Sequence, residues 1–131
     1  MTLLALRDGF AARAAATSGA FTDLGAYLEK DLRVKQLVKT IWPDYDKQEE
    51  QILATRSAIR WPERIGAPLL MMHGGADRQV SPLQSLSLAI RLEELGKGYG
   101  LLIFAGDNHV LSENRLERDR QAVLWFKKHL K

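Results

Sequence analysis

The chain has 131 residues, enough for one domain with a moderate hydrophobic core. Hydrophobic residues make up 46% and charged residues 27%, which is typical of a folded globular protein and excludes a disordered one. The net charge is only +3, and the bases alternate with acids at residues 115–120, so we expect no nucleic-acid partner. The absence of cysteine excludes disulfides and a cysteine nucleophile, and three scattered histidines predict neither a metal site nor a cofactor.

The N-terminal residues do not have the pattern of a targeting signal. The apolar run at residues 2–6 is short, follows no basic segment and is interrupted by Asp8. No stretch reaches the roughly 18 apolar residues that a membrane span needs. We therefore expect a soluble protein with no membrane partner. The lack of cysteine is compatible with a reducing, cytoplasmic compartment.

The first half of the chain predicts a helix, a strand and two further helices. Residues 1–7 are rich in leucine and alanine and end before a glycine, as helices commonly do. Residues 10–17 form a run of small residues short enough for a buried strand. Apolar residues then recur at helical spacing over 24–41, and a further helix is expected over 47–55.

The second half predicts two strands, each followed by a helix. Residues 68–73 and 99–104 are apolar runs of strand length, and the segment 82–95 between them has a helical pattern that begins at a proline and stops at a glycine. A final helix is expected from Asn114. We expect its apolar residues to face inward, namely Leu116, Val123, Leu124, Trp125 and Leu130. Alternating strands and helices predict an α/β fold with a parallel sheet covered on both faces, in one domain spanning 1–131.

An acid and a histidine follow the last two predicted strands. Asp77 comes after the strand at 68–73, and His109 comes after the strand at 99–104. The working groups of open α/β sheets lie just beyond the carboxyl ends of the strands, and parallel neighbours are about 5 Å apart. Either residue alone is also typical of an ordinary loop. Together they predict the acid–base half of a Ser-His-Asp relay.

Several segments resemble the prolyl oligopeptidase family of serine peptidases, which includes dipeptidyl and acylaminoacyl peptidases. The sequence HGGADRQVSPLQS at residues 73–85 resembles the family's acid loop, and FAGDNH at 104–109 resembles its histidine loop. Residues 125–130 resemble its closing helix. Residues 15–24 resemble the strand and turn that follow the nucleophile helix, and 1–6 resemble the body of that helix.

This resemblance implies the C-terminal half of an α/β-hydrolase catalytic domain, that is, a partial α/β-hydrolase fold. It implies that Asp77 is the triad acid, that His109 is the triad base and that Gln79 contacts a carbonyl of a peptide or ester substrate. The G-x-S-x-G elbow that carries the nucleophile is not found in the sequence, and the oxyanion donors would lie in the same missing segments. We therefore expect a serine-hydrolase fragment that is inactive alone.

No serine in the chain has the setting of a nucleophile. Ser18 is the best placed, at a strand end, but it lacks the sharp strand-to-helix turn that exposes a nucleophile. Helix capping and solvation explain Ser81, Ser85 and Ser87, and Ser112 has the position of a loop or cap residue.

The predicted fragment leaves its first strand, 10–17, with a bare edge. Such an edge invites pairing with another chain, so we expect a homodimer or a complementing N-terminal half. Three interpretations stay open: a catalytic-domain fragment with little activity, a non-catalytic α/β association module, and a half that rebuilds an active enzyme with a separate serine-bearing fragment.

Overall fold

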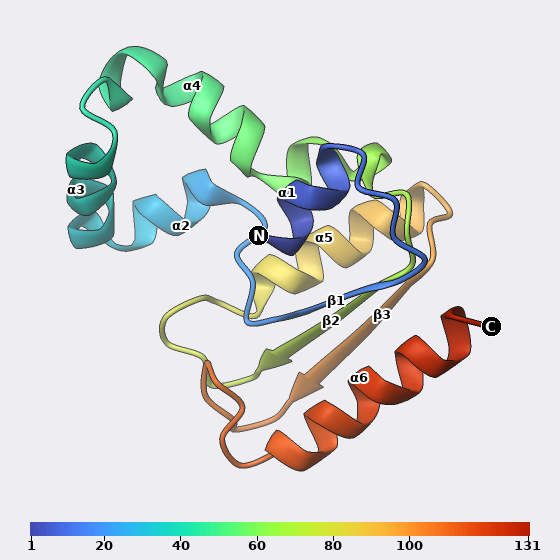
Figure 1. The fold of residues 1–131 in the computed structure, drawn as a ribbon. Coiled ribbons are helices and arrows are strands. Elements are labelled where there is room, and N and C mark those ends of the chain that lie inside the picture. Colours follow the sequence, from blue (N-terminus) through green and yellow to red (C-terminus); the bar gives the residue numbers. More distant parts are fainter.

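Three parallel strands form the centre of the molecule. The computed structural model describes residues 1–131 and orders the strands β1 (Ala15–Ser18), β2 (Leu69–Gly74) and β3 (Tyr99–Phe104), with β2 in the middle (Figure 1). Every residue of β2 is buried, which fits its nearly continuous apolar sequence. The predicted α/β architecture with parallel strands flanked by helices is confirmed.

Helices cover both faces of this sheet. α1 (Thr2–Arg7) and α5 (Leu83–Glu94) lie on one face, and α6 (Arg115–His129) lies on the other (Figure 1). Successive side chains of a strand point to opposite faces, so Leu69 and Met71 of β2 join the α1–α5 cluster. The intervening residues of β2, Leu70 and Met72, pack instead with residues of α6 and its preceding loop.

Between β1 and β2 the chain forms a helical arm that projects away from the sheet. Its helices are α2 (Leu24–Lys30), α3 (Leu32–Ile41) and α4 (Tyr45–Arg56), and two short 3₁₀ helices, η1 (Ala58–Arg60) and η2 (Pro62–Arg64), lead back to β2 (Figure 1). The arm has its own small core, made of Leu24, Leu28, Val38, Tyr45 and Ile52.

Two predicted boundaries in the first half were wrong. The strand expected over 10–17 begins only at Ala15, because its ladder with β2 starts at the pair Ala15–Leu69 and earlier residues have no strand beside them. The helix expected over 24–41 is interrupted at Asp31, where the backbone is extended and the carboxylate caps the following helix.

The prediction that α6 turns its apolar residues inward was wrong for most of them. Only Trp125, with Ala122, packs against the cluster on that face of the sheet. The others are 45–87% exposed: Leu116, Val123 and Leu124 in the helix, and Leu130 directly after it. None of the helices, α6 included, combines the length and apolar character that crossing a membrane requires.

The end of β2 passes directly beneath the loop that follows β3. Gly74 is the last residue of β2, and a Cβ atom there would overlap the carbonyl oxygens of Asp107 and Asn108. A hydrogen bond also connects the loop after β2 to the loop after β3, since the N–H of Ala76 donates to the carbonyl oxygen of Asp107 at 2.9 Å. The two loops that carry Asp77 and His109 are therefore packed backbone against backbone, and only glycine fits at the contact.

We expect Gly74→Ala to destabilise the fold by about 2–3 kcal/mol, because overpacking against immobile backbone forces the chain to shift. Urea unfolding at pH 7 measures this change. Gly66→Ala is the matched control, since a Cβ at Gly66 meets nothing within 4 Å. Equal stability of the two variants would contradict the close packing of the two loops.

Candidate functional site

Asp77 and His109 are brought together at the carboxyl ends of β2 and β3. Nδ1 of His109 lies 2.8 Å from Oδ2 of Asp77, within hydrogen-bond distance. Asp77 is 5% exposed, whereas the side chain of His109 is 29% exposed. The structure therefore pairs the two residues as the sequence predicted, with the acid buried and the histidine at the surface of a cavity.

Backbone groups of its own loop hold the other oxygen of the Asp77 carboxylate. The N–H groups of Gln79 and Val80 donate to Oδ1 at 2.8 and 2.9 Å. Burial alone would raise the pKa of Asp77, but the donors from Val80, His109 and Gln79 outweigh burial and lower that pKa below its usual value. Asp77 is consequently an ionised, oriented acceptor for His109 at neutral pH.

The contact with Asp77 fixes the orientation and tautomer of the His109 ring. A carboxylate oxygen only accepts, so Nδ1 of His109 carries the proton that it donates to Asp77. In the neutral ring, Nε2 then has a free lone pair and can accept a proton. Gly19, just after β1, packs against the ring so closely that a Cβ there would lie 2.9 Å from Cε1 of His109.

A second buried carboxylate holds the histidine loop. Asp107 is 1% exposed and accepts from the N–H groups of Asn108, Glu113 and Asn114 and from the side-chain amide of Asn114. Burial would raise the pKa of Asp107, but the Asn114 side chain and the three backbone donors lower it. These bonds tie both ends of the loop around His109 to the start of α6.

Leu111 anchors the same loop in the core. Its side chain is fully buried and packs with Leu70 and Met72, although its φ of 55° lies in the left-handed region that leucine rarely adopts. Such a conformation persists where the surrounding contacts over-determine it. Hydrogen bonds on one side of His109 and a buried leucine on the other therefore restrain the loop.

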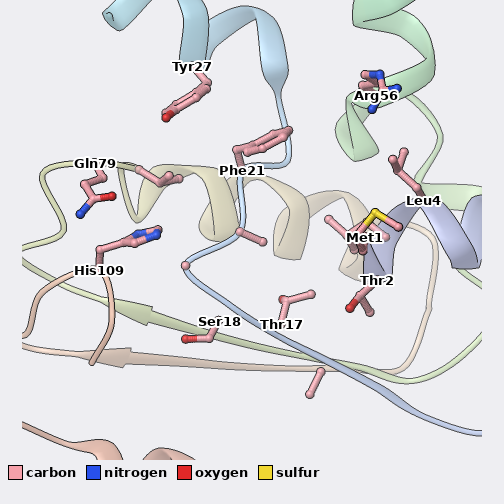
Figure 2. A pocket seen from close by; sticks show the side chains of 15 residues that line it. Met1, Thr2, Leu4, Thr17, Ser18, Phe21, Tyr27, Arg56, Gln79 and His109 are labelled. Carbon is pink, nitrogen blue, oxygen red and sulfur yellow. The ribbon is translucent and has the colours of Figure 1, made fainter. Parts of the chain in front are cut away.

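His109 opens into a cavity of about 530 Å³ between α1, β1 and the acid loop. Figure 2 shows His109 and Gln79 at one end of this cavity and Met1 at the other. Gln79 is exposed, and it reaches the cavity with His109. The three residues to which the family resemblance gives roles thus lie around one site, with Asp77 behind His109.

The serines of the chain do not complete a relay with His109. Ser18 is exposed at the end of β1 and lines the cavity, but it forms no hydrogen bond with either ring nitrogen of His109. Ser112 accepts a hydrogen bond from the amide of Asn108, and the hydroxyl of Ser81 accepts from the backbone N–H of Leu83. Ser87 is exposed on α5, whereas Ser85 and Ser57 are buried, and the hydroxyl of Ser57 accepts from the N–H of Leu24.

Sequence reasoning missed two polar residues that support the site. Asp107 reads as an ordinary turn residue beside Gly106, and its four donors come from positions up to seven residues away. His73 reads as the polar end of an apolar strand, but it is fully buried and 3.1 Å from Asp77. The period of two along β2 was the available signal, because it places His73 on the same face as Leu69 and Met71, toward α5.

Parallel strands with an acid and a histidine beyond their carboxyl ends are the arrangement of α/β-hydrolases. The fold matches 98% of this chain to 20% of a puromycin-hydrolysing peptidase from Mycobacterium tuberculosis, with a TM-score of 0.81 and 26% identity. A model of the prolyl oligopeptidase family matches residues 1–131. The chain belongs to the prolyl oligopeptidase family.

Curated relatives include acylamino-acid-releasing enzymes of two mammals. The chain is 33% identical to the enzyme of Rattus norvegicus over 90 residues, which are 67% of this chain and 12% of that protein. It is 35% identical to the enzyme of Homo sapiens over 77 residues, which are 57% of this chain and 10% of that protein. The matched segments thus span only about a tenth of these relatives.

The lowered pKa of Asp77 predicts that the folded chain loses stability as the pH falls. A carboxyl whose pKa is lower in the folded than in the unfolded state stabilises the fold above its unfolded pKa of roughly 3.9. That stability is lost as the pH falls through the folded pKa. We therefore expect Asp77→Asn to lose less unfolding free energy than the parent chain between pH 6 and pH 2, as measured by urea unfolding.

Asp107, whose pKa is also lowered in the fold, stabilises both the parent chain and Asp77→Asn above acid pH. Some loss of unfolding free energy in acid should therefore remain in the variant. The same acid-induced loss in Asp77→Asn as in the parent would show that the Asp77 carboxylate is not held by its donors.

Proposed function

We propose that the chain is the part of a serine-type peptidase or hydrolase catalytic domain that carries the triad acid, Asp77, and the triad base, His109. The hydrogen bond between these residues carries the proposal, because it leaves Nε2 of His109 free beside a cavity. The serine nucleophile comes from a segment outside these 131 residues.

In this proposal, Nε2 of His109 takes the proton of the serine hydroxyl as the serine oxygen attacks the substrate's carbonyl carbon. The resulting imidazolium donates that proton to the leaving group when the peptide or ester bond of the substrate breaks. Water then attacks the acyl-enzyme with His109 again acting as base, which restores the serine. Asp77 stays ionised throughout and stabilises the imidazolium through Nδ1.

The proposed substrate is a peptide or an ester, and Gln79 is proposed to contact a substrate carbonyl. The side-chain amide of Gln79 is a hydrogen-bond donor at the same end of the cavity as His109 (Figure 2). The relatives named above are acylamino-acid-releasing enzymes and a puromycin-hydrolysing peptidase, which favours the peptide. The chemistry proposed for Asp77 and His109 needs no cofactor.

The free edge of β1 supports a partner that supplies the nucleophile. β1 pairs only with β2, so the N–H and C=O groups along its other edge have no strand beside them. We propose that a strand carrying the serine pairs there, either from a separate N-terminal half or from a longer chain. A homodimer through the same edge, as a non-catalytic association module, is the alternative.

We expect the 131-residue chain alone to form no covalent adduct with a fluorophosphonate, read by intact mass, because no serine hydroxyl is hydrogen-bonded to His109. A stoichiometric adduct would show that this chain contains an activated serine of its own and would contradict the proposal that the nucleophile comes from elsewhere. Comparing Ser18→Ala with the exposed control Ser87→Ala would then identify the reacting serine.

We expect fluorophosphonate to label a joined protein, in which this chain is fused to an upstream segment of the same family that carries a G-x-S-x-G turn. His109→Ala and Asp77→Asn should each reduce the labelling rate by a factor on the order of 10³ or more, because relay residues act as a unit. Ser87→Ala should leave the rate unchanged. A folded, joined protein that does not label, or that labels equally well without His109, would overturn the proposed function. A stable dimer of the unjoined chain in light scattering would favour the association module.

A further inference from the structure

His73 is a buried histidine that takes no part in the proposed relay of serine, His109 and Asp77. It lies near the end of β2 and is completely inaccessible to solvent. Its Nε2 is 3.0 Å from the carbonyl oxygen of Val80 and 3.1 Å from Oδ2 of Asp77. Its Nδ1 is 2.8 Å from the hydroxyl of Ser85 on α5, which is 1% exposed. Both ring nitrogens therefore face a polar atom inside the core.

These contacts determine which nitrogen of His73 carries the proton. The two atoms that face Nε2 are a carbonyl oxygen and a carboxylate oxygen, and both only accept. Nε2 must therefore be protonated. In the neutral ring Nδ1 is then an acceptor, and it receives the hydroxyl proton of Ser85. The tautomer of His73 is thus the reverse of that of His109, whose proton is on Nδ1.

We propose that His73 is a positioning residue for the acid of the site, with its tautomer set by Ser85. The Nε2–H group donates to Val80, which closes the turn that carries Asp77, and it presents its positive end to Oδ2 of Asp77. This oxygen is the one that accepts from His109. A polar chain therefore runs from α5 through Ser85, His73 and Asp77 to His109.

The burial of these groups supports a role beyond packing. An apolar side chain would fill the space of His73 without burying polar atoms, whereas a buried imidazole is tolerated only when its nitrogens are paired. The titratable groups that contact the Asp77 carboxylate are His73 from β2 and His109 from the loop after β3. Backbone donors occupy the other carboxylate oxygen, so the two histidines share Oδ2 between them.

The role in catalysis rests on the proposed function, but the tautomer can be measured without any catalysis. Nitrogen-15 NMR of the histidine-labelled 131-residue chain at neutral pH distinguishes a protonated ring nitrogen from one with a lone pair. We expect the buried ring, assigned by its loss in His73→Phe, to carry its proton on Nε2. A ring with the proton on Nδ1 and a bare Nε2 would overturn the inference and leave the proposed function of Asp77 and His109 intact.

Two variants test the chain of contacts. Ser85→Ala should shift the Nδ1 resonance of His73, because it removes that atom's donor, while Ser87→Ala on the exposed side of α5 should leave the spectrum unchanged. His73→Phe should raise the pKa of Asp77, followed through its carboxyl carbon, because the variant replaces the polarised Nε2–H group 3.1 Å from Oδ2 with an apolar ring.

An unchanged Nδ1 resonance in Ser85→Ala would overturn the tautomer assignment, and this variant keeps the test decisive if His73→Phe does not fold. A folded His73→Phe protein with an unchanged pKa of Asp77 would overturn the positioning role. Failure of the joined protein to label would instead count against the proposed function, so the two ideas can fail separately.

Discussion

One carboxylate organises the region that we identify as functional. Asp77 is almost completely buried, and it is ionised because donors from its own loop and from His109 outweigh the effect of burial. An ionised group inside a protein is costly unless each oxygen is paired, so the loops around it must hold their donors in place. The geometry of the acid loop, the direction of the His109 ring and the burial of His73 all follow from this requirement.

The sheet supplies the frame that makes this arrangement possible. The parallel register of β2 and β3 brings the loops after both strands to the same edge, and Gly74 lets their backbones touch. Asp107 and Leu111 then restrain the loop of His109 from either side. His109 consequently lines the cavity beside β1, which is an edge strand of the sheet. The proposed nucleophile would have to arrive along that edge.

Local patterns in the sequence predicted the architecture and the central pair, but not their supports. The strand at 99–104 was predicted with its observed bounds, because apolar runs between glycines are a strong local signal. Asp77 and His109 were predicted because position after a strand is also local. The start of β1 and the outward-facing residues of α6 depend on which elements lie beside them, and local periodicity does not contain that information. The same holds for His73, whose partners come from α5 and the acid loop.

The hydrogen bond between His109 and Asp77 can be observed directly as the proton resonance of Nδ1–H in His109. Proton NMR of the 131-residue chain near neutral pH and at low temperature should show this resonance far downfield, where protons shared with a carboxylate are found. It should disappear in Asp77→Asn while the backbone spectrum remains that of a folded protein. A folded parent chain without the resonance, or an Asp77→Asn variant that keeps it unchanged, would contradict the pairing of acid and base at this site.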